Sequence, residues 1–258
     1  MSGPTPLLDF FKRGEVARDV RMMAAQGILA PRAQEQLAIL VLLLEDSDPE
    51  IRGVAETTLN RIPIEALQAF LARSDVPVDL REFFGDRGVF PAQIPAIEVD
   101  DPLIDTADPG ADPDDAEEAR ESVQQRIADM GFTDRLKAAV KGTKEMRAIL
   151  IRDPNKMISA AVLSSPKVTE QEAAGYARMA SLSEDVLRAI GSNRAWLKNY
   201  GVVLGLTRNP KTPLAMSLNL MSRLQDRDVA TLSVDRNVPE ALRLAARKKV
   251  AASMSGKG

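Results

Sequence analysis

Short apolar stretches with helical spacing follow one another along most of the chain, separated by polar or proline-containing turns. Residues 33–45 are apolar on nearly every side, which predicts a central, buried helix. Amphipathic patterns predict further helices over residues 7–13, 15–26 and 49–59, and proline-initiated helices from Pro63 and Pro77. The same spacing resumes at residue 116 and continues almost to the end of the chain. The pattern predicts an all-α fold.

Polar residues at the predicted helix starts support this assignment. Asp48, Asp153 and Thr143 stand where an N-cap is expected, because their side-chain oxygens accept from the free backbone N–H groups of a first turn. Thr169 and Glu172 have the spacing of a capping box. We therefore expect short helices joined by turns of a few residues.

Part of the pattern repeats. The segments EMRAILIRDP (145–154), DVLRAIGSNR (185–194) and DVATLSVDRN (228–237) align with offsets of 40 and 43 residues. The proline turns SSPKVT (164–169) and RNPKTP (208–213) align with an offset of 44 residues. A period in the low forties with three helices per unit is typical of α-solenoids, in which stacked units bury a continuous core.

Two motifs resemble known repeat families. Asp48-Pro49-Glu50-Ile51-Arg52, followed by Ala55 and Leu59, resembles the second helix of a HEAT repeat. The turn Asn209-Pro210-Lys211-Thr212-Pro213 resembles the turns of leucine-rich variant repeats. The C-terminal half also resembles a bacterial helical-repeat family with no established activity to carry over. These resemblances imply an α-solenoid of HEAT/armadillo-like repeats that presents a binding surface.

Residues 86–117 interrupt the helical pattern with a stretch rich in Pro, Asp and Ala. We therefore expect an N-terminal HEAT-like domain (1–97), an acidic linker (98–117) and a C-terminal repeat solenoid (118–258). Phe90, Ile94, Ile97 and the pair Leu103–Ile104 are the apolar exceptions. They are expected to fix the ends of the linker to a neighbouring surface.

Charge is unevenly distributed between these parts. Residues 98–132 hold 2 basic and 12 acidic residues, a net charge of −10. Residues 133–258 hold 22 basic and 11 acidic residues, a net charge of +11. Such asymmetry indicates an electrostatic partner, which is either external or the linker itself. The linker is then expected to contact the basic solenoid and to compete with an acidic partner.

The segment SNRAWLKNYG (192–201) and the turn after its helix hold the candidate binding residues. We expect a basic edge that binds acidic or phosphate groups, made of Arg194, Lys198, Arg208, Lys211 and Arg236. Trp196, Asn199 and Tyr200 are candidate stacking or contact residues. The alternative for the two aromatic rings is that they pack together under the preceding helix.

Reaction chemistry is poorly supported. The chain has no Cys and no His, so thiolate ligands, cysteine nucleophiles and the commonest general base are excluded. The carboxylate pairs Glu184/Asp185 and Asp226/Asp228 fall in predicted first helical turns, where acids complement the helix dipole. Lys141-Gly142-Thr143-Lys144 lacks the leading glycine of a phosphate-binding loop and is interpreted as a C-cap followed by an N-cap. We expect no enzyme activity, no catalytic residue, no cofactor and no metal.

We therefore expect a non-catalytic protein-binding scaffold or adaptor whose partner is a protein with an acidic surface. The alternative is binding of nucleic-acid backbones by the basic solenoid, as HEAT-like bacterial DNA glycosylases do, although no glycosylase motif maps onto this chain. The N-terminus shows no secretory signal pattern. The longest apolar run, residues 37–44, is too short to span a bilayer. These features predict a cytoplasmic protein without membrane insertion.

Overall fold

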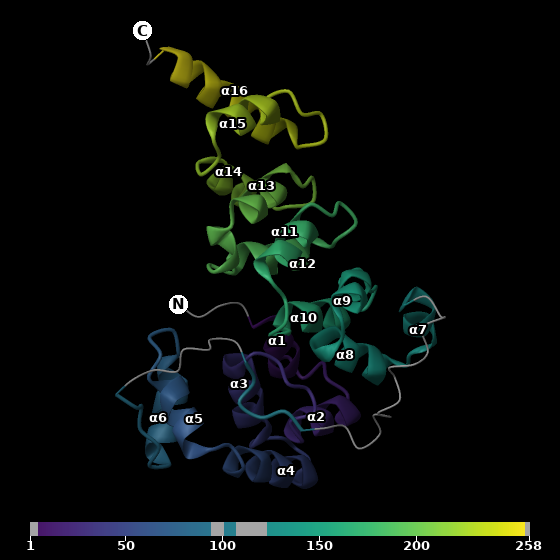
Figure 1. The fold of residues 1–258 in the computed structure, drawn as a ribbon, viewed down its shortest axis with the longest axis vertical. Coiled ribbons are helices and arrows are strands. Elements are labelled where there is room, and N and C mark those ends of the chain that lie inside the picture. The colour runs from purple at the N-terminus through teal and green to yellow at the C-terminus, as the bar shows by residue number, and fades with distance from the viewer. Residues whose placement is uncertain (1–4, 94–100, 107–122, 256–258) are drawn as a thin grey trace. The chain divides into compact units, whose positions relative to one another are not determined.

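The computed structural model describes residues 5–93, 101–106 and 123–255. Every regular element in these three ranges is a helix, which confirms the all-α prediction (Figure 1). The chain divides into two compact units, residues 1–167 and 168–258. Each unit is considered by itself below.

The first unit contains ten helices in its described residues: α1 (Pro6–Lys12), α2 (Arg18–Ala25), α3 (Ala33–Leu43), α4 (Pro49–Asn60), α5 (Ile64–Leu71), α6 (Val78–Asp86), α7 (Val123–Asp129), α8 (Phe132–Lys141), α9 (Lys144–Leu150) and α10 (Lys156–Ser164). The second unit contains α11 (Glu170–Ala177), α12 (Glu184–Ser192), the 3₁₀ turn η1 (Trp196–Lys198), α13 (Tyr200–Arg208), α14 (Leu214–Met221), α15 (Asp226–Leu232) and α16 (Glu240–Ser255).

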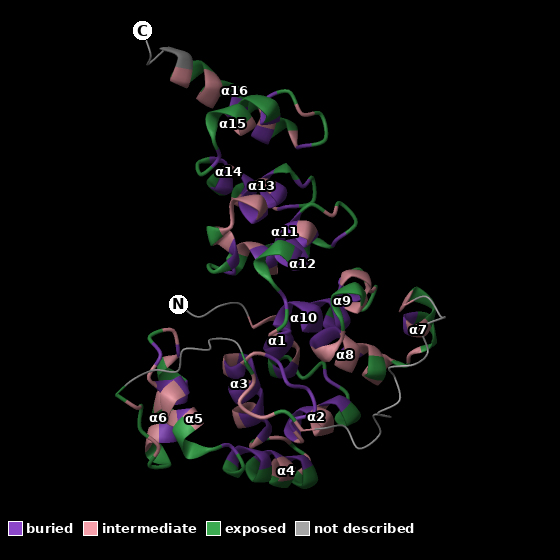
Figure 2. Cartoon of the chain, in the orientation of Figure 1, coloured by how far each residue is buried: buried purple, intermediate pink, exposed green. Residues whose placement is uncertain are grey.

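Two helices form the centre of the first unit. The predicted buried helix is α3, which packs against α1, α2 and α4. The other is α10, which packs against α1, α8 and α9 and is buried at every position from Met157 to Ser164 (Figure 2). The helix α1 joins the two groups, since it contacts both α3 and α10.

The boundary between the units follows Lys167 and does not coincide with the predicted linker, residues 98–117. Hydrogen bonds of Arg32 explain the difference. The backbone N–H of Arg32 donates to the carbonyl oxygen of Ser164 (3.1 Å), and its Nη1 donates to that of Leu163 (2.8 Å). Residues 123–167 therefore share a core with the N-terminal helices. Most of the predicted linker lies outside the described residues.

A buried carboxylate completes this core. Glu35 of α3 is only 2% exposed, and its Oε1 accepts from the backbone N–H groups of Leu7 (2.7 Å) and Leu8 (2.9 Å). These are donors of the first turn of α1, whose own N-cap, Thr5, makes no side-chain cap. Burial raises the pKa of Glu35 from its usual value to about 7, although the bonds from Leu8, Ser164 and Leu7 act in the opposite direction.

The predicted caps are largely confirmed. Asp48 and Thr143 accept from first-turn N–H groups, and Thr169 with Glu172 forms the capping box. The start of α10 differs, because its N-cap is Asn155 and not Asp153. The carboxylate of Asp153 accepts instead from the N–H of Asn155 (2.8 Å) and from Arg135 Nη1 (2.8 Å).

The three aligned segments end in the same kind of turn. Asp153, Asn193 and Asp235 each accept a hydrogen bond, through Oδ1, from the backbone N–H two residues further on. The three distances are 2.8, 3.0 and 3.0 Å. The α-helices that follow these turns are α10, α13 and α16, and η1 comes between the Asn193 turn and α13. The alignment therefore pairs positions with the same local geometry.

A second kind of contact recurs beside α10, α13 and α16. One side chain directly after α10, one directly after α13 and one within α16 each donate to a carbonyl oxygen at the end of the helix packed beside it. Ser165 Oγ donates to Val140 (2.6 Å), Asn209 Nδ2 to Ala177 (2.9 Å), and Lys249 Nζ to Met221 (3.0 Å). These bonds satisfy last-turn carbonyl groups that have no partner within their own helices.

Candidate functional site

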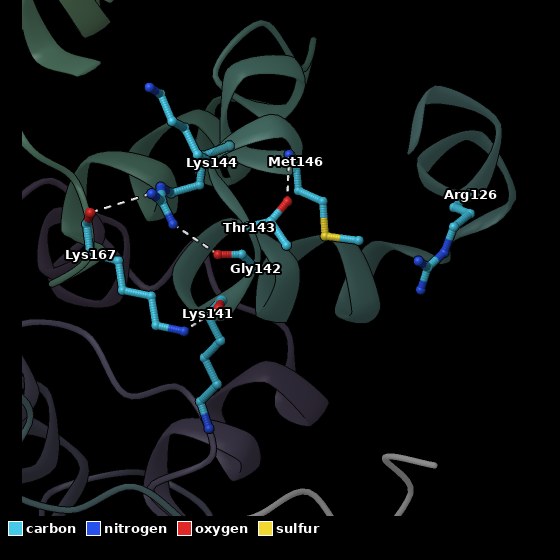
Figure 3. Close-up of a pocket in the computed structure, with 8 residues that line it drawn as sticks. Arg126, Lys141, Gly142, Thr143, Lys144, Met146 and Lys167 are labelled. Atoms are coloured by element: carbon cyan, nitrogen blue, oxygen red, sulfur yellow. Dashed lines mark hydrogen bonds between the residues drawn. The ribbon is translucent and has the colours of Figure 1, made fainter. Parts of the chain in front are cut away.

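A hollow of about 480 Å³ lies where α8 ends and α9 begins (Figure 3). It is lined by Arg126 of α7, Lys141 of α8, the turn residues Gly142 and Thr143, three residues of α9 (Lys144, Met146, Arg147) and Lys167. Five of the eight lining residues are Lys or Arg, and none is Asp or Glu. We refer to it below as the basic hollow.

The sharp turn between the two helices depends on Gly142. A Cβ atom at this position would lie 2.4 Å from the carbonyl oxygen of Ala138, so a larger residue would force the backbone to shift. The next residue, Thr143, is the N-cap of α9 and accepts from the N–H of Met146 (3.4 Å). This confirms that the segment is a C-cap followed by an N-cap.

Two of the basic residues hold the rim of the basic hollow in place. Arg147 is 4% exposed, and its guanidinium donates to the carbonyl oxygens of Gly142 (2.8 Å) and Lys167 (3.3 Å). Lys167 in turn donates from Nζ to the carbonyl oxygen of Lys141 (2.6 Å). Arg147 is thus a structural residue whose charge lies beneath the surface.

The other lysines are more available. Lys144 is exposed, and its side chain makes no hydrogen bond or ion pair within the described parts of the chain. Lys141 forms an ion pair with Asp105 and also lies 3.5 Å from the carbonyl oxygen of Thr106. The amino groups of Lys141, Lys144 and Lys167 point in different directions (Figure 3). The positive charge is therefore spread over a surface, which suits an extended acidic partner better than one small anion.

One carboxylate borders the lysines. The pKa of Glu145 is held below its usual value, chiefly because its own backbone N–H and the Thr143 hydroxyl hydrogen-bond to it. The charges of Lys144 and Arg147 act in the same direction. Glu145 therefore stays ionised at neutral pH, in the first turn of α9.

The predicted basic edge falls at both ends of α13. Arg194 and Lys198 lie in the turn before this helix, whereas Arg208 and Lys211 lie at and beyond its last residue. Nine residues of α-helix span about 13 Å, which separates the two groups. Arg208 Nη2 lies 3.4 Å from Asp235 Oδ2, next in sequence to Arg236. The structure thus brings Arg208 close to the turn that contains Arg236, and leaves Arg194 and Lys198 at the other end.

The three candidate contact residues have structural contacts. Trp196 is 4% exposed, so its ring is not available for stacking on a ligand. Asn199 is the N-cap of α13 and accepts from the N–H of Gly201 (2.8 Å). The hydroxyl of Tyr200 donates to Asp228 and accepts from the N–H of Gln225 (3.1 Å). Desolvation and the bond to Asp228 raise the pKa of Tyr200 above its usual value.

We expect Tyr200→Phe to lower the free energy of unfolding of the second unit by about 1 kcal/mol, because both bonds of the hydroxyl are lost. Trp196, the only tryptophan of the chain, lies in this unit and reports its unfolding by urea through fluorescence. The exposed residue Thr231 provides a control, since Thr231→Val removes only a bond to its own helix. Equal stability of Tyr200→Phe and wild type would show that the hydroxyl contacts contribute nothing.

The sequence did not predict the basic hollow as a site. The sequence of its central turn, Lys141 to Lys144, predicts only the end of one helix and the start of the next. Arg126 and Lys167 come from other parts of the first unit. One available signal was the lysine shared by the two aligned proline turns, Lys167 and Lys211. Both side chains donate to a backbone carbonyl oxygen, of Lys141 and Ser181 respectively.

Nothing in the described residues indicates a metal centre, since no three acidic side chains there are grouped to hold an ion. Within the same ranges, no helix has both the length and the apolar character needed to cross a bilayer. No protein-family model, curated protein or solved structure matches the chain. The likeness to HEAT and armadillo repeats therefore stays a prediction, and any function must be argued from the residues themselves.

Proposed function

We propose that the protein is a non-catalytic scaffold or adaptor that binds a partner protein with an acidic surface. The basic hollow is the contact site. The observation that carries this proposal is its lining, which includes five Lys and Arg residues and no acidic one. Glu145 and Asp105 lie beside the lining and are outnumbered by these cations. Complementary charge on a partner would raise the association rate and favour one orientation of docking.

The geometry of the cations supports a macromolecular partner. Arg147 and Lys167 are committed to backbone carbonyl groups, whereas Lys144 projects into solvent. Such a surface has a rigid base and at least one adaptable charge. It offers no enclosed cavity with converging groups of the kind that small ligands require.

The recurring contacts support the repeat part of the proposal. The turn bonds at Asp153, Asn193 and Asp235 are the local features expected if HEAT/armadillo-like units stack in a solenoid. Exposed helix surfaces of such units are where repeat proteins bind partners. The predicted basic edge is a second candidate surface, in the other unit, where Arg208 pairs with Asp235 next to Arg236.

The acidic linker is the internal competitor in this proposal. Asp105, within the predicted linker, forms an ion pair with Lys141 at the basic hollow. An acidic partner would then exchange this contact for its own. Residues 107–117 of the linker lie outside the described residues and add nothing to the argument.

Charge reversal at Lys144 tests the site. We expect Lys144→Glu to weaken binding of a fluorescein-labelled poly-glutamate peptide about five- to thirtyfold, because an attraction is replaced by a repulsion, each of about 0.5–1 kcal/mol. Fluorescence anisotropy at low and raised salt measures the affinity. Lys248→Glu, an equally exposed lysine of α16, is the matched control.

The remaining outcomes decide between surfaces and partners. Loss of binding with Lys198→Glu but not with Lys144→Glu would refute the basic hollow and favour the predicted basic edge. A labelled DNA duplex and a single strand are tested in parallel. If they bind more tightly than poly-glutamate at matched salt, nucleic-acid-backbone binding replaces the protein-partner proposal.

A further inference from the structure

Residues 103–106 bind to three residues of the helical part of the first unit, Gly27, Gln36 and Lys141, which we call the seat. Gln36 of α3 is 2% exposed, and its side-chain amide contacts the main chain of Leu103 and Ile104. Its Oε1 accepts from both N–H groups, at 2.8 and 3.1 Å, and its Nε2 donates to the carbonyl oxygen of Ile104. A buried carboxamide thus recognises donors and acceptors of a backbone, whatever side chains that backbone carries.

A glycine makes room beside this amide. Gly27, with φ at +75°, follows α2, and its carbonyl oxygen accepts from the N–H of Thr106 (3.2 Å). A Cβ atom at Gly27 would lie 3.1 Å from Thr106 Oγ1 and 3.4 Å from Ile104 Cγ2. The close approach of the segment therefore depends on the absence of a side chain here.

The third contact recognises charge. Asp105 lies between Ile104 and Thr106 in the sequence and forms an ion pair with Lys141 of α8. Leu103 and Ile104 are half-buried, whereas Asp105 is exposed. The seat, defined as Gly27, Gln36 and Lys141, therefore accepts a short pattern of two apolar residues, an acid and a residue whose N–H points inward.

The space beside the seat is not filled by the segment. Thr106 lines a second hollow of about 590 Å³, together with residues of α4 such as Gly53 and Thr58. The hydroxyl of Thr106 is buried there without a hydrogen-bond partner among the described residues. A larger side chain at this position would find room in this hollow, and an apolar one would avoid burying an unpartnered hydroxyl.

We propose that the seat is a peptide-binding site for partner proteins, and that residues 103–106 are its resident occupant. The partner would contribute a non-helical segment with the pattern apolar, apolar, acidic, followed by a side chain larger than Thr. Most of the resident's bonds are to its main chain, so another segment of this pattern reproduces them. Displacement would also release Lys141 from Asp105. The inference does not require that the basic hollow bind anything.

Residues 103–106 are covalently attached to the chain that binds them, and this attachment determines how the site must be tested. A covalently attached segment competes at an effective concentration on the order of millimolar, so a free peptide binds the wild-type chain weakly. The probe is a labelled synthetic peptide with the sequence of residues 101–106, Asp-Pro-Leu-Ile-Asp-Thr. The variant Ile104→Pro removes a resident N–H donor and leaves the seat intact.

We expect the full chain with Ile104→Pro to bind this peptide at least about tenfold more tightly than wild type in an anisotropy titration. Ile104→Ala, which keeps the N–H, should show a much smaller gain. Adding Gln36→Ala to Ile104→Pro should abolish the gain. Binding no tighter than wild type, in a variant whose circular dichroism shows native helix content, would overturn the proposal.

Amide hydrogen exchange in wild type decides the matter if Ile104→Pro does not fold. Excess peptide should accelerate exchange at the N–H groups of Leu103, Ile104 and Thr106, since displacement exposes them to water. Unchanged exchange there would overturn the proposal. Lys144→Glu separates the two sites, because it should leave peptide binding to the seat within about twofold while weakening poly-glutamate binding.

Discussion

At about pH 8, Glu35→Gln should be more stable than wild type by as much as about 3 kcal/mol, and the difference should vanish at about pH 4. The folded chain raises the pKa of this carboxyl to about 7, mainly through burial. Between the ordinary pKa of Glu and 7, the folded state retains a proton that the unfolded state has lost. Wild-type stability therefore falls as the pH rises through this range, whereas glutamine has no proton to lose.

Urea unfolding followed by circular dichroism measures this effect, and Trp196 fluorescence identifies the transition of the second unit. Glu35→Ala is the necessary comparison. It leaves the N–H groups of Leu7 and Leu8 without an acceptor and should cost about 2–4 kcal/mol even at low pH. A wild-type stability that rises between about pH 5 and 7, relative to Glu35→Gln, would contradict the raised pKa.

In the second unit, Asn209→Ala should lower the free energy of unfolding by about 2–4 kcal/mol. Asn209 is 3% exposed, and its Nδ2 donates to the carbonyl oxygens of Ala177 (2.9 Å) and Met179 (3.1 Å). Its Oδ1 accepts from the N–H of Lys211 (3.0 Å). Alanine would leave the buried carbonyl group of Ala177 and two partly buried backbone groups without this partner at the junction of α11 and α13.

Trp196 fluorescence in urea measures this loss, because the indole is buried in the same unit. The control is Asn219→Ala on α14, where the side chain is exposed and the stability should change by less than about 0.5 kcal/mol. Equal midpoints for Asn209→Ala and Asn219→Ala would show that the junction does not depend on the carboxamide.

Local features were the most predictable part of the fold. Capping at Asp48, Thr143 and Thr169 involves residues within one turn of each other, so sequence spacing is enough to predict it. The burial of residues 33–43 followed from an apolar pattern without a polar face. Leu103 and Ile104 were expected to fix the linker to a neighbouring surface, and they do so through main-chain hydrogen bonds to Gln36. Phe90, of which the same was expected, is 63% exposed, and Ile94 and Ile97 lie outside the described residues.

Contacts between distant segments were not predictable. Nothing in the local pattern indicates that Glu35 accepts hydrogen bonds from the first turn of α1. The same is true of the binding of Gln36 to a segment nearly seventy residues away. The assignment of residues 123–167 to the first unit depends on Arg32 and the end of α10. Polar residues within an apolar helix were the available signal, and their partners could be known only from the fold.

The candidate site shows the same limit. Trp, Tyr and Asn residues draw attention in a sequence, yet the contacts of Trp196, Asn199 and Tyr200 are those of packing and capping. The basic hollow instead collects ordinary lysines from separate helices. Charge totals predicted that basic surface exists, whereas its location depends on which helix ends meet.

The donors at Ser165, Asn209 and Lys249 have a consequence for how such a chain can change over time. A hydroxyl, a carboxamide and an ammonium group each bind a carbonyl oxygen at the end of a neighbouring helix. The contact therefore requires a side chain that is long enough to reach the carbonyl oxygen and has a proton to donate, but it does not require one particular amino acid. Groups of helices joined in this way can therefore differ widely in sequence while the spacing of their helices is preserved.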